Sequence, residues 1–388
     1  MKGIMRNMTG VNINRNTRRR PAMFPKAFRK VSATLKEGLS LNKARADCLS
    51  AFIITAVEAK SILLDDTVKR LPGSAKGKSK FRRLQDFFCE VRPDYSSVAL
   101  MIMGFVARLT DKSLVLSMDR TGWKTRGGHE YNLLVLSVCL GDMGLPVLWC
   151  DLRRLGNSTA RKRKRLVQRF IRLFGVERIR CLIGDREFIG AEWFDWLQEE
   201  HVPFLMRLRH DIRIANTQGG MTPGRDLFRH LRVGEVMDLG SRRAFKTTMG
   251  ICATRIRSGE LLILGYHAGL DGPTALAMYR QRWNIETGFE KFKTHGFNLE
   301  SSRLRGGGKM ERVLAALSLA AAWSYAGGAW SVRVNGPIKL KKHGRREHSV
   351  FRRGLELLGG FFHGIAVDLR RTEQAVFGLL RMAARGVG

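Results

Sequence analysis

The sequence predicts an α/β protein, with a mixed sheet flanked by helices and a helical region on either side of it. Two observations carry this prediction. Between residues 26 and 110 apolar residues recur at three- and four-residue spacing, which is typical of amphipathic helices. From residue 113 short apolar runs alternate with amphipathic stretches in the order β-β-β-α-β-α-β, which predicts antiparallel strands followed by α/β crossovers.

The composition favours a folded protein that binds a polyanion. The chain has 388 residues, and 69 Lys and Arg against 34 Asp and Glu give a formal charge of +35. Because 44% of the residues are hydrophobic, the chain can bury a core, which excludes a wholly disordered basic tail. The charge indicates nucleic acid most simply, although composition alone leaves DNA, RNA and an anionic membrane open.

Residues 1–25 are Arg-rich and predicted to form a flexible basic arm. They contain no apolar stretch of the kind found in signal peptides. The six cysteines show neither C-x-x-C pairs nor zinc-ligand spacing, so we expect reduced, buried thiols in a cytosolic protein. These cysteines are Cys48, Cys89, Cys139, Cys150, Cys181 and Cys252.

Residues 26–110 are predicted to form a helical DNA-binding domain. The first 50 residues are strongly basic, which favours helix-turn-helix-like DNA contact over a merely solvated helical cap. The expected helices cover residues 41–57, 62–71, 80–89 and 96–109.

Residues 111–330 are predicted to form the central α/β domain. Its expected strands cover 113–119, 131–139, 145–151, 179–184 and 203–208, with a hairpin turn at 141–144 and helices at 159–174 and 190–201. Residues 209–272 break this rhythm and predict a β-rich insertion, followed by helices at 276–294 and 310–326. Residues 331–388 form a basic, helical C-terminal region.

One uncharged stretch, residues 313–332, is long enough for a membrane span. Half of it is Ala or Ser and it contains Gly327 and Gly328, so a buried helix of a soluble core is the favoured interpretation.

Two carboxylates, Asp119 and Asp185, are expected at the carboxyl ends of strands, where α/β sheets place their sites. A carboxylate flanked by apolar runs needs a cation partner, because an unpaired buried charge is costly. An arginine is the simple partner, and a divalent metal ion is the alternative.

The helix predicted from residue 276 carries Tyr279, Arg282, Glu286 and Lys293 within about 60° of one another at 100° per residue. Apolar residues lie beside this stripe, so Glu286 is expected at the rim of the core, where a third metal ligand would be needed. A surface pair between Arg282 and Glu286 is the simpler explanation, which the stripe alone does not exclude.

These four residues match the pattern Y-x2-R-x3-E-x6-K, and the segment YRQRWNIETGFEKFK around them resembles insertion-sequence-4 type DD(E/D) transposases. Asp119 in SMDRTGWK resembles the first catalytic aspartate of that family, and Asp185 in IGDREF the second. The resemblance covers roughly residues 40–330. It implies an RNase H-like catalytic domain interrupted by a β-rich insertion, which we expect at 209–272.

The resemblance implies an enzyme that cuts transposon ends and joins the freed 3′-hydroxyl to target DNA. Asp119, Asp185 and Glu286 would be the catalytic ligands of two Mg²⁺ ions, for which Mn²⁺ can substitute. Tyr279, Arg282 and Lys293 would bind phosphates of the cut strand. The partners would be terminal inverted repeats, target DNA and a second copy of the chain, in the nucleoid of a bacterial cytoplasm.

The five consecutive basic residues of a predicted helix are further candidates for phosphate contact, although a solvated helix face is the simpler interpretation. They are Arg161, Lys162, Arg163, Lys164 and Arg165. Weaker candidates for metal binding are Glu187 and Glu290, and the pair His129 and Glu130 is expected at the surface.

One departure from the family concerns base stacking. Relatives stack a flipped base on a tryptophan of the insertion, but no tryptophan lies between Trp196 and Trp283. Either Phe228, Phe245 or Tyr266 stacks on the base instead, or the element handles hairpins differently. Two other functions stay open: a transposase-derived DNA-binding protein without catalysis, and an RNA-binding protein, which the charge alone suggests.

Overall fold

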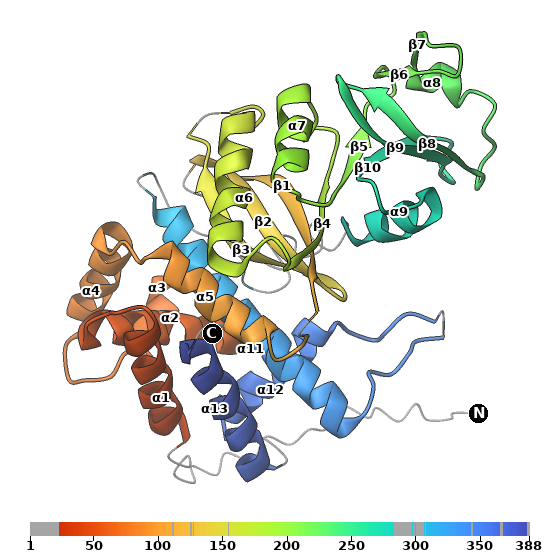
Figure 1. Cartoon of the computed structure of the whole chain (residues 1–388). Coiled ribbons are helices and arrows are strands. Elements are labelled where there is room, and N and C mark those ends of the chain that lie inside the picture. Colours follow the sequence, from red (N-terminus) through yellow and green to blue (C-terminus); the bar gives the residue numbers. More distant parts are fainter. Residues whose placement is uncertain are drawn as a thin grey trace, which may run out of the picture.

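The computed structural model describes residues 23–385, apart from 111, 125, 127, 154, 283–296, 298, 300–305, 307, 343 and 365–367. It is a mixed α/β protein with one ten-stranded mixed sheet and helices at both ends of the chain (Figure 1). The helices of the two ends gather on one side of the sheet, and the insertion strands extend from its opposite end.

The N-terminal helices confirm the helical pattern predicted before residue 110. Asn42 and Asp94 cap two of them by accepting hydrogen bonds from backbone N–H groups of the first turn. The helices are α1 (Met23–Gly38), α2 (Lys43–Ala59), α3 (Leu64–Val68), α4 (Gly77–Glu90) and α5 (Tyr95–Val106).

The central strands follow the predicted order of β-β-β-α-β-α-β. Strand β1 pairs antiparallel with β2, and β2 with β3, whereas β1 and β4 run parallel, as do β4 and β5. The elements are β1 (Leu114–Lys124), β2 (Glu130–Leu140), β3 (Met143–Asp151), α6 (Ala160–Phe174), β4 (Ile179–Gly184), α7 (Ala191–Glu199) and β5 (Phe204–Leu208).

The predicted insertion is β-rich, but it continues the main sheet. Strand β10 pairs antiparallel with β5, which gives the strand order β3-β2-β1-β4-β5-β10-β9-β8-β6-β7. Its elements are β6 (Arg213–Ala215), β7 (Met221–Pro223), α8 (Gly224–Leu227), β8 (Val236–Ala244), β9 (Thr247–Arg255) and β10 (Leu261–Tyr266).

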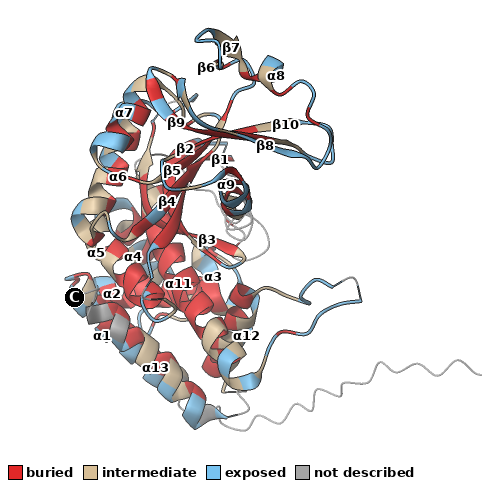
Figure 2. Ribbon diagram, turned by 45° about the vertical axis from the view of Figure 1, so that its right-hand side comes forward, coloured by how far each residue is buried: buried red, intermediate tan, exposed pale blue. Residues whose placement is uncertain are grey.

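Helix α11 (Lys309–Asn335) is the central helix of the helical layer. It packs against α2, α5 and α12 (Val350–Phe362), and α13 (Leu369–Arg385) packs on α5 and α1. Of the described helices, α11 alone is long and apolar enough to cross a membrane, but 89% of its most apolar window is buried inside the protein (Figure 2). This burial confirms the prediction of a core helix.

The two faces of the sheet are covered by different helices. One face packs with α5, α6, α7 and α11 in a core that also includes the N-terminal helices. The other face packs with α9 (Gly272–Tyr279) through a separate cluster that includes Val115, Cys181 and Ile183. Because side chains alternate along a strand, every second residue of β1 and β4 belongs to the α9 face.

All six cysteines are free thiols, as expected. Cys48, Cys181 and Cys252 are buried, whereas Cys89 is exposed, so the prediction of uniformly buried thiols is wrong for Cys89. Burial raises the pKa of Cys139 and of Cys181 to about 12, which keeps both thiols protonated.

Candidate active site

Asp119 and Asp185 lie next to each other at the point where β1 and β4 cease to pair. The last parallel register pair of these strands is Met118 with Gly184. Asp119 is the next residue of β1, and Asp185 is the first residue after β4. Neighbouring strands lie about 4.8 Å apart, so the two aspartate backbones adjoin. The strand register therefore brings the two aspartates together, and their role as metal ligands stays a prediction.

The same register assigns both carboxylates to the α9 face. Val115 and Ser117 precede Asp119 at two-residue spacing, and Cys181 and Ile183 precede Asp185 in the same way. Val115, Cys181 and Ile183 belong to the cluster beneath α9. One detail of the prediction is wrong, because β1 continues to Lys124 along β2 and only its pairing with β4 ends before Asp119.

Each carboxylate is half-buried and oriented by a local backbone hydrogen bond. The Arg120 amide donates to Asp119 Oδ1 at 2.7 Å, and the Glu187 amide donates to Asp185 Oδ1 at 2.8 Å. A bond of this kind fixes the side-chain rotamer while the second oxygen of a carboxylate remains a strong ligand.

The element that carries Tyr279 and Arg282 differs from the predicted long helix. Helix α9 ends at Tyr279, and residues Arg280–Arg282 form a 3₁₀ turn. The stripe predicted for an α-helix with 100° per residue is therefore interrupted in this segment. Tyr279 is 5% exposed in the cluster against the sheet. The Arg282 guanidinium carbon lies 5.8 Å from the centre of the Tyr279 ring, at cation–π distance.

The turn after α9 lies against the same sheet face as the aspartates. Cys139 Sγ of β2 lies 3.8 Å from the Gln281 carbonyl oxygen, which fixes the turn beside the antiparallel half of the sheet. The chain therefore approaches the aspartate face at Arg282. Glu286, Glu290 and Lys293 lie outside the described residues, and their predicted roles stay predictions.

The Glu187 carboxylate is occupied by hydrogen bonds, which disfavours its predicted role as a weaker candidate for metal binding. Its carboxylate accepts hydrogen bonds from Arg120 Nε at 2.8 Å, from the Ser158 amide at 2.9 Å and from Ser158 Oγ at 3.0 Å. The Glu187 side chain is only 10% exposed. This network is not predicted from the sequence, although the positions of Arg120 and Glu187, close behind the two candidate aspartates, are a signal for it.

The basic run at 161–165 divides between surface and core. Arg161 and Arg165 are exposed and lie four residues apart, on one face of α6. Lys162 donates to the Leu152 carbonyl at 2.9 Å, and Lys164 pairs with Glu192 at 3.0 Å.

Arg163 is buried in the core, so its prediction as a DNA-binding residue is wrong. It is 5% exposed, donates to Ser158 Oγ and to the Ser158 carbonyl at 2.8 Å each, and lies over the Phe188 ring at 5.1 Å. Burial lowers the pKa of Arg163, and the neighbouring Glu187 and Asp185 oppose that shift.

The family model for the transposase DDE domain matches residues 110–323, the stretch that carries both aspartates and the α9 face. The chain belongs to the transposase DDE-domain family. Among solved structures, the cryo-EM structure of a piggyBac transposase synaptic complex with hairpin DNA is similar, with a TM-score of 0.44 and 11% sequence identity. That match covers 92% of this chain and 83% of the other. Among curated proteins, none matches the sequence.

Within the DDE domain, the described residues supply two of the three predicted metal ligands. No group of three or more His, Cys, Asp or Glu side chains able to hold a metal ion occurs among them. The third predicted carboxylate, Glu286, lies outside the described residues, so its role stays a prediction. Carboxylate oxygens at the rim of a sheet are hard donors that suit Mg²⁺ and Mn²⁺.

The aromatic residues considered for base stacking are packed inside the DDE domain. Phe228 is fully buried, Tyr266 is 3% exposed, and Phe245 packs on Phe194 with ring centres 5.3 Å apart. Burial leaves no open ring face on Phe228 or Tyr266, so these two predictions are not retained, whereas Phe245 is only partly buried and stays a prediction. His129 and Glu130 are exposed, as predicted.

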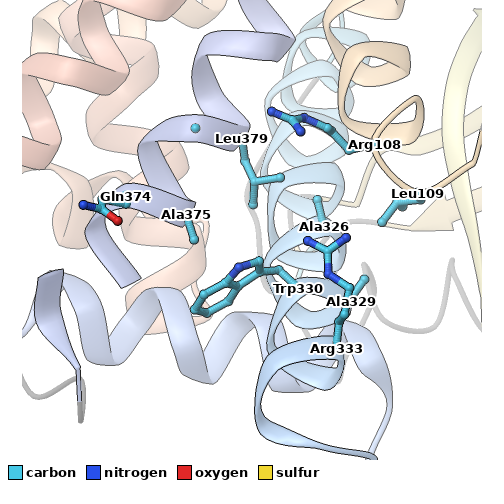
Figure 3. Close-up of a pocket in the computed structure, with 10 residues that line it drawn as sticks. Arg108, Leu109, Ala326, Ala329, Trp330, Arg333, Gln374, Ala375 and Leu379 are labelled. Atoms are coloured by element: carbon cyan, nitrogen blue, oxygen red, sulfur yellow. The ribbon is translucent and has the colours of Figure 1, made fainter. Parts of the chain in front are cut away.

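A separate pocket of about 390 Å³ lies between α11, α13 and the end of α5 (Figure 3). Trp330 lies at its centre, with Arg108 and Arg333 beside it, and none of the described residues that line it is a carboxylate. These described lining residues therefore offer no carboxylate oxygen to a divalent metal ion.

Proposed function

We propose that the protein is a DNA transposase of the insertion-sequence-4 type with an RNase H-like core. In this proposal Asp119, Asp185 and Glu286 hold two divalent metal ions. The observation that carries the proposal is the adjacency of Asp119 and Asp185 on one sheet face, directly beyond the last register pair of two parallel strands. Carboxylates brought together in this way repel each other unless a cation lies between them.

The residues fit Mg²⁺, because both are half-buried carboxylates whose rotamers are held by backbone amides. Bound Mg²⁺ ions would activate an attacking oxygen and stabilise the leaving 3′ oxygen. The protein's own contribution is to hold the scissile phosphodiester in line with a water molecule and later with the 3′-hydroxyl of the element. No side-chain nucleophile is required.

DNA binding in this proposal relies on cations around the carboxylates. Arg161 and Arg165 on α6, together with Arg282 and Lys293, would contact phosphates of the transposon end and target. The net charge of +35 supports a long DNA contact. Two ends must be joined, so a homodimer is the expected assembly, located at the nucleoid of a bacterial cytoplasm.

The test is cleavage of DNA that carries the inverted repeats flanking the gene. We expect nicking with Mg²⁺ or Mn²⁺, and at least a hundredfold loss in Asp185→Asn, since a metal ligand is worth several kcal/mol. End binding, measured by gel shift, should stay within about twofold. Asp211→Asn is the matched control, because Asp211 is exposed and pairs with Arg209 away from the sheet face.

Two outcomes separate the alternatives. Specific end binding without cleavage by the wild type in either metal would indicate a DNA-binding protein that has lost catalysis. Equal cleavage by the wild type and Asp185→Asn would show that the carboxylate assignment is wrong.

A further inference from the structure

We propose that the ion pair between Arg120 and Glu187 is a brace that sets the separation of the Asp119 and Asp185 carboxylates, which makes both residues positioning residues of the metal site. This inference rests on the proposed function. It identifies a task for two residues that contact neither substrate nor metal.

The brace begins where the backbone pairing ends. Beyond Met118 and Gly184, β1 and β4 share no further register pair. Arg120 is the residue after Asp119, and Glu187 lies two residues after Asp185. The contact of Arg120 Nε with Glu187 Oε2 at 2.8 Å therefore links the two strand ends just beyond the aspartates.

The brace lies behind the carboxylates rather than among them. Asp119 belongs to the α9 face, so alternation along β1 assigns Arg120 to the opposite face, which α6 covers. Asn132 accepts from Arg120 Nη1 on that side at 3.4 Å, and Ser158, just before α6, donates to Glu187. The ion pair therefore lies on the sheet face opposite to the one that carries the two carboxylates.

Glu187 is held more tightly than an ordinary ion-pair partner. Its carboxylate accepts from the Ser158 amide and hydroxyl as well as from Arg120. Ser158 is in turn clamped by Arg163, which is buried over the Phe188 ring. The Glu187 amide also donates directly to Asp185 Oδ1. A shift of Glu187 is therefore transmitted to the Asp185 carboxylate through one hydrogen bond.

Metal sites tolerate only small errors in ligand placement, of about 0.5 Å. Outer residues that orient metal ligands typically cost 10–100-fold in metal affinity when they are replaced. Glu187→Gln keeps the shape of the side chain and can still accept from Ser158, but it removes the charge that holds Arg120. We expect its Mn²⁺ dissociation constant to rise about tenfold.

The experiment measures Mn²⁺ binding to the full chain by electron paramagnetic resonance, through loss of the free-ion signal, together with thermal unfolding. The variants are Glu187→Gln, Arg120→Gln and the double variant. The two residues act through one contact. The double variant should therefore lose no more Mn²⁺ affinity than the single variant with the larger loss. Arg120 is the more exposed residue of the pair. Arg120→Gln therefore tests the same contact if Glu187→Gln fails to fold.

Glu58→Gln is the matched control for stability. Glu58 and Arg70 form an ion pair with side-chain exposures of 6% and 22%, close to the 10% and 32% of Glu187 and Arg120, but in the helical layer. This control should lower the unfolding temperature without changing Mn²⁺ affinity. If the ion pair only supports the fold, Glu187→Gln will also lower the unfolding temperature without changing Mn²⁺ affinity. That result would overturn the proposal.

Asp185→Asn separates failure of the brace from failure of the function. In one outcome the wild type binds Mn²⁺ and Asp185→Asn does not, while the Mn²⁺ dissociation constants of folded Glu187→Gln and Arg120→Gln stay within twofold of the wild-type value. In that case the proposed brace is wrong and the metal site stands. If wild type and Asp185→Asn bind Mn²⁺ equally, or neither binds it, the metal site and the brace both fall.

Discussion

Asp119 and Asp185 become neighbours because Met118 and Gly184 form the last register pair of two parallel strands. The position of Asp185 therefore depends on how closely Gly184 packs. A Cβ at Gly184 would lie 2.6 Å from Met206 Sδ and 3.0 Å from Phe188 Cβ, both of them buried. The absence of a side chain at this position lets β4 approach β5 and the turn that follows Asp185.

The first prediction is that Gly184→Ala lowers both the stability of the protein and its affinity for Mn²⁺. The added methyl group overpacks the core, so we expect a loss of about 1–3 kcal/mol in the free energy of unfolding. Relaxation moves the adjoining Asp185, so Mn²⁺ affinity should fall as well. Denaturant unfolding and Mn²⁺ titration measure the two effects.

Gly122→Ala on β1 is the control for this substitution. A Cβ there meets only the Tyr131 carbonyl oxygen, at 3.8 Å. The variant should keep wild-type stability and metal affinity. An unchanged Mn²⁺ affinity in Gly184→Ala would contradict the dependence of Asp185 on this packing.

The second prediction concerns the exposed arginines of α6. Each phosphate contact contributes about 0.9 to the slope of log K against log salt concentration, so Arg161→Ala/Arg165→Ala should reduce that slope by about 2. Fluorescence anisotropy with transposon-end DNA measures it. Stability should not change, since both side chains are at the surface.

Arg255→Ala is a control that removes one positive charge outside α6. Its guanidinium donates to the carbonyl groups of Leu231 and Gly259, and we expect no phosphate contact. Its salt slope should equal that of the wild type. A double variant of Arg161 and Arg165 with the same slope as the wild type would remove α6 from the DNA interface.

Most of the central sheet could be predicted from the sequence, because strands with apolar runs and clear turns carry a strong local signal. β4 was predicted at its observed bounds, Ile179–Gly184. The sequence also predicts Asp119 and Asp185 at the carboxyl ends of strands in one sheet. Their adjacency depends on the pairing of β1 with β4, which no local signal shows.

Features that depend on contacts between distant segments could not be predicted. The burial of Arg163 is set by Ser158 and Phe188, so a run of five basic residues gave no sign of it. The end of α9 at Tyr279 was missed, because helical periodicity continues through the 3₁₀ turn. The insertion joins the main sheet because β10 pairs with β5, and the paired residues, from Ile263 with Leu208 onward, lie at least 55 positions apart in the chain.

The third prediction is a pH-dependent contribution to stability from Asp238. Burial acts to raise the pKa of this carboxyl, but hydrogen bonds from Tyr266, Gly240 and Gly272 outweigh it and lower the pKa below its usual value. A lowered folded-state pKa stabilises the protein above the unfolded-state pKa, and this contribution is lost as the pH falls through the folded-state pKa.

Asp238→Asn should therefore lower the free energy of unfolding by about 1 kcal/mol at neutral pH, the worth of a hydrogen bond. The difference from the wild type should be constant down to about pH 5 and shrink below about pH 4. Urea unfolding at several pH values measures it. A difference that is equally large at about pH 3 would show that the carboxylate charge is not responsible.

The fourth prediction concerns the crossing of α11 and α12. A Cβ at Gly354 would overlap the Ser324 carbonyl oxygen, and one at Gly328 would overlap the Val350 carbonyl oxygen, so the two backbones touch at this crossing. Because backbone atoms cannot yield as a flexible side chain can, Gly354→Ala should force the helices apart and cost about 3 kcal/mol or more. Gly359→Ala on the same helix meets nothing within 4 Å and should gain up to about 1 kcal/mol from helix propensity. Circular dichroism during thermal unfolding distinguishes the two, and shifts of equal sign and size would refute the close crossing.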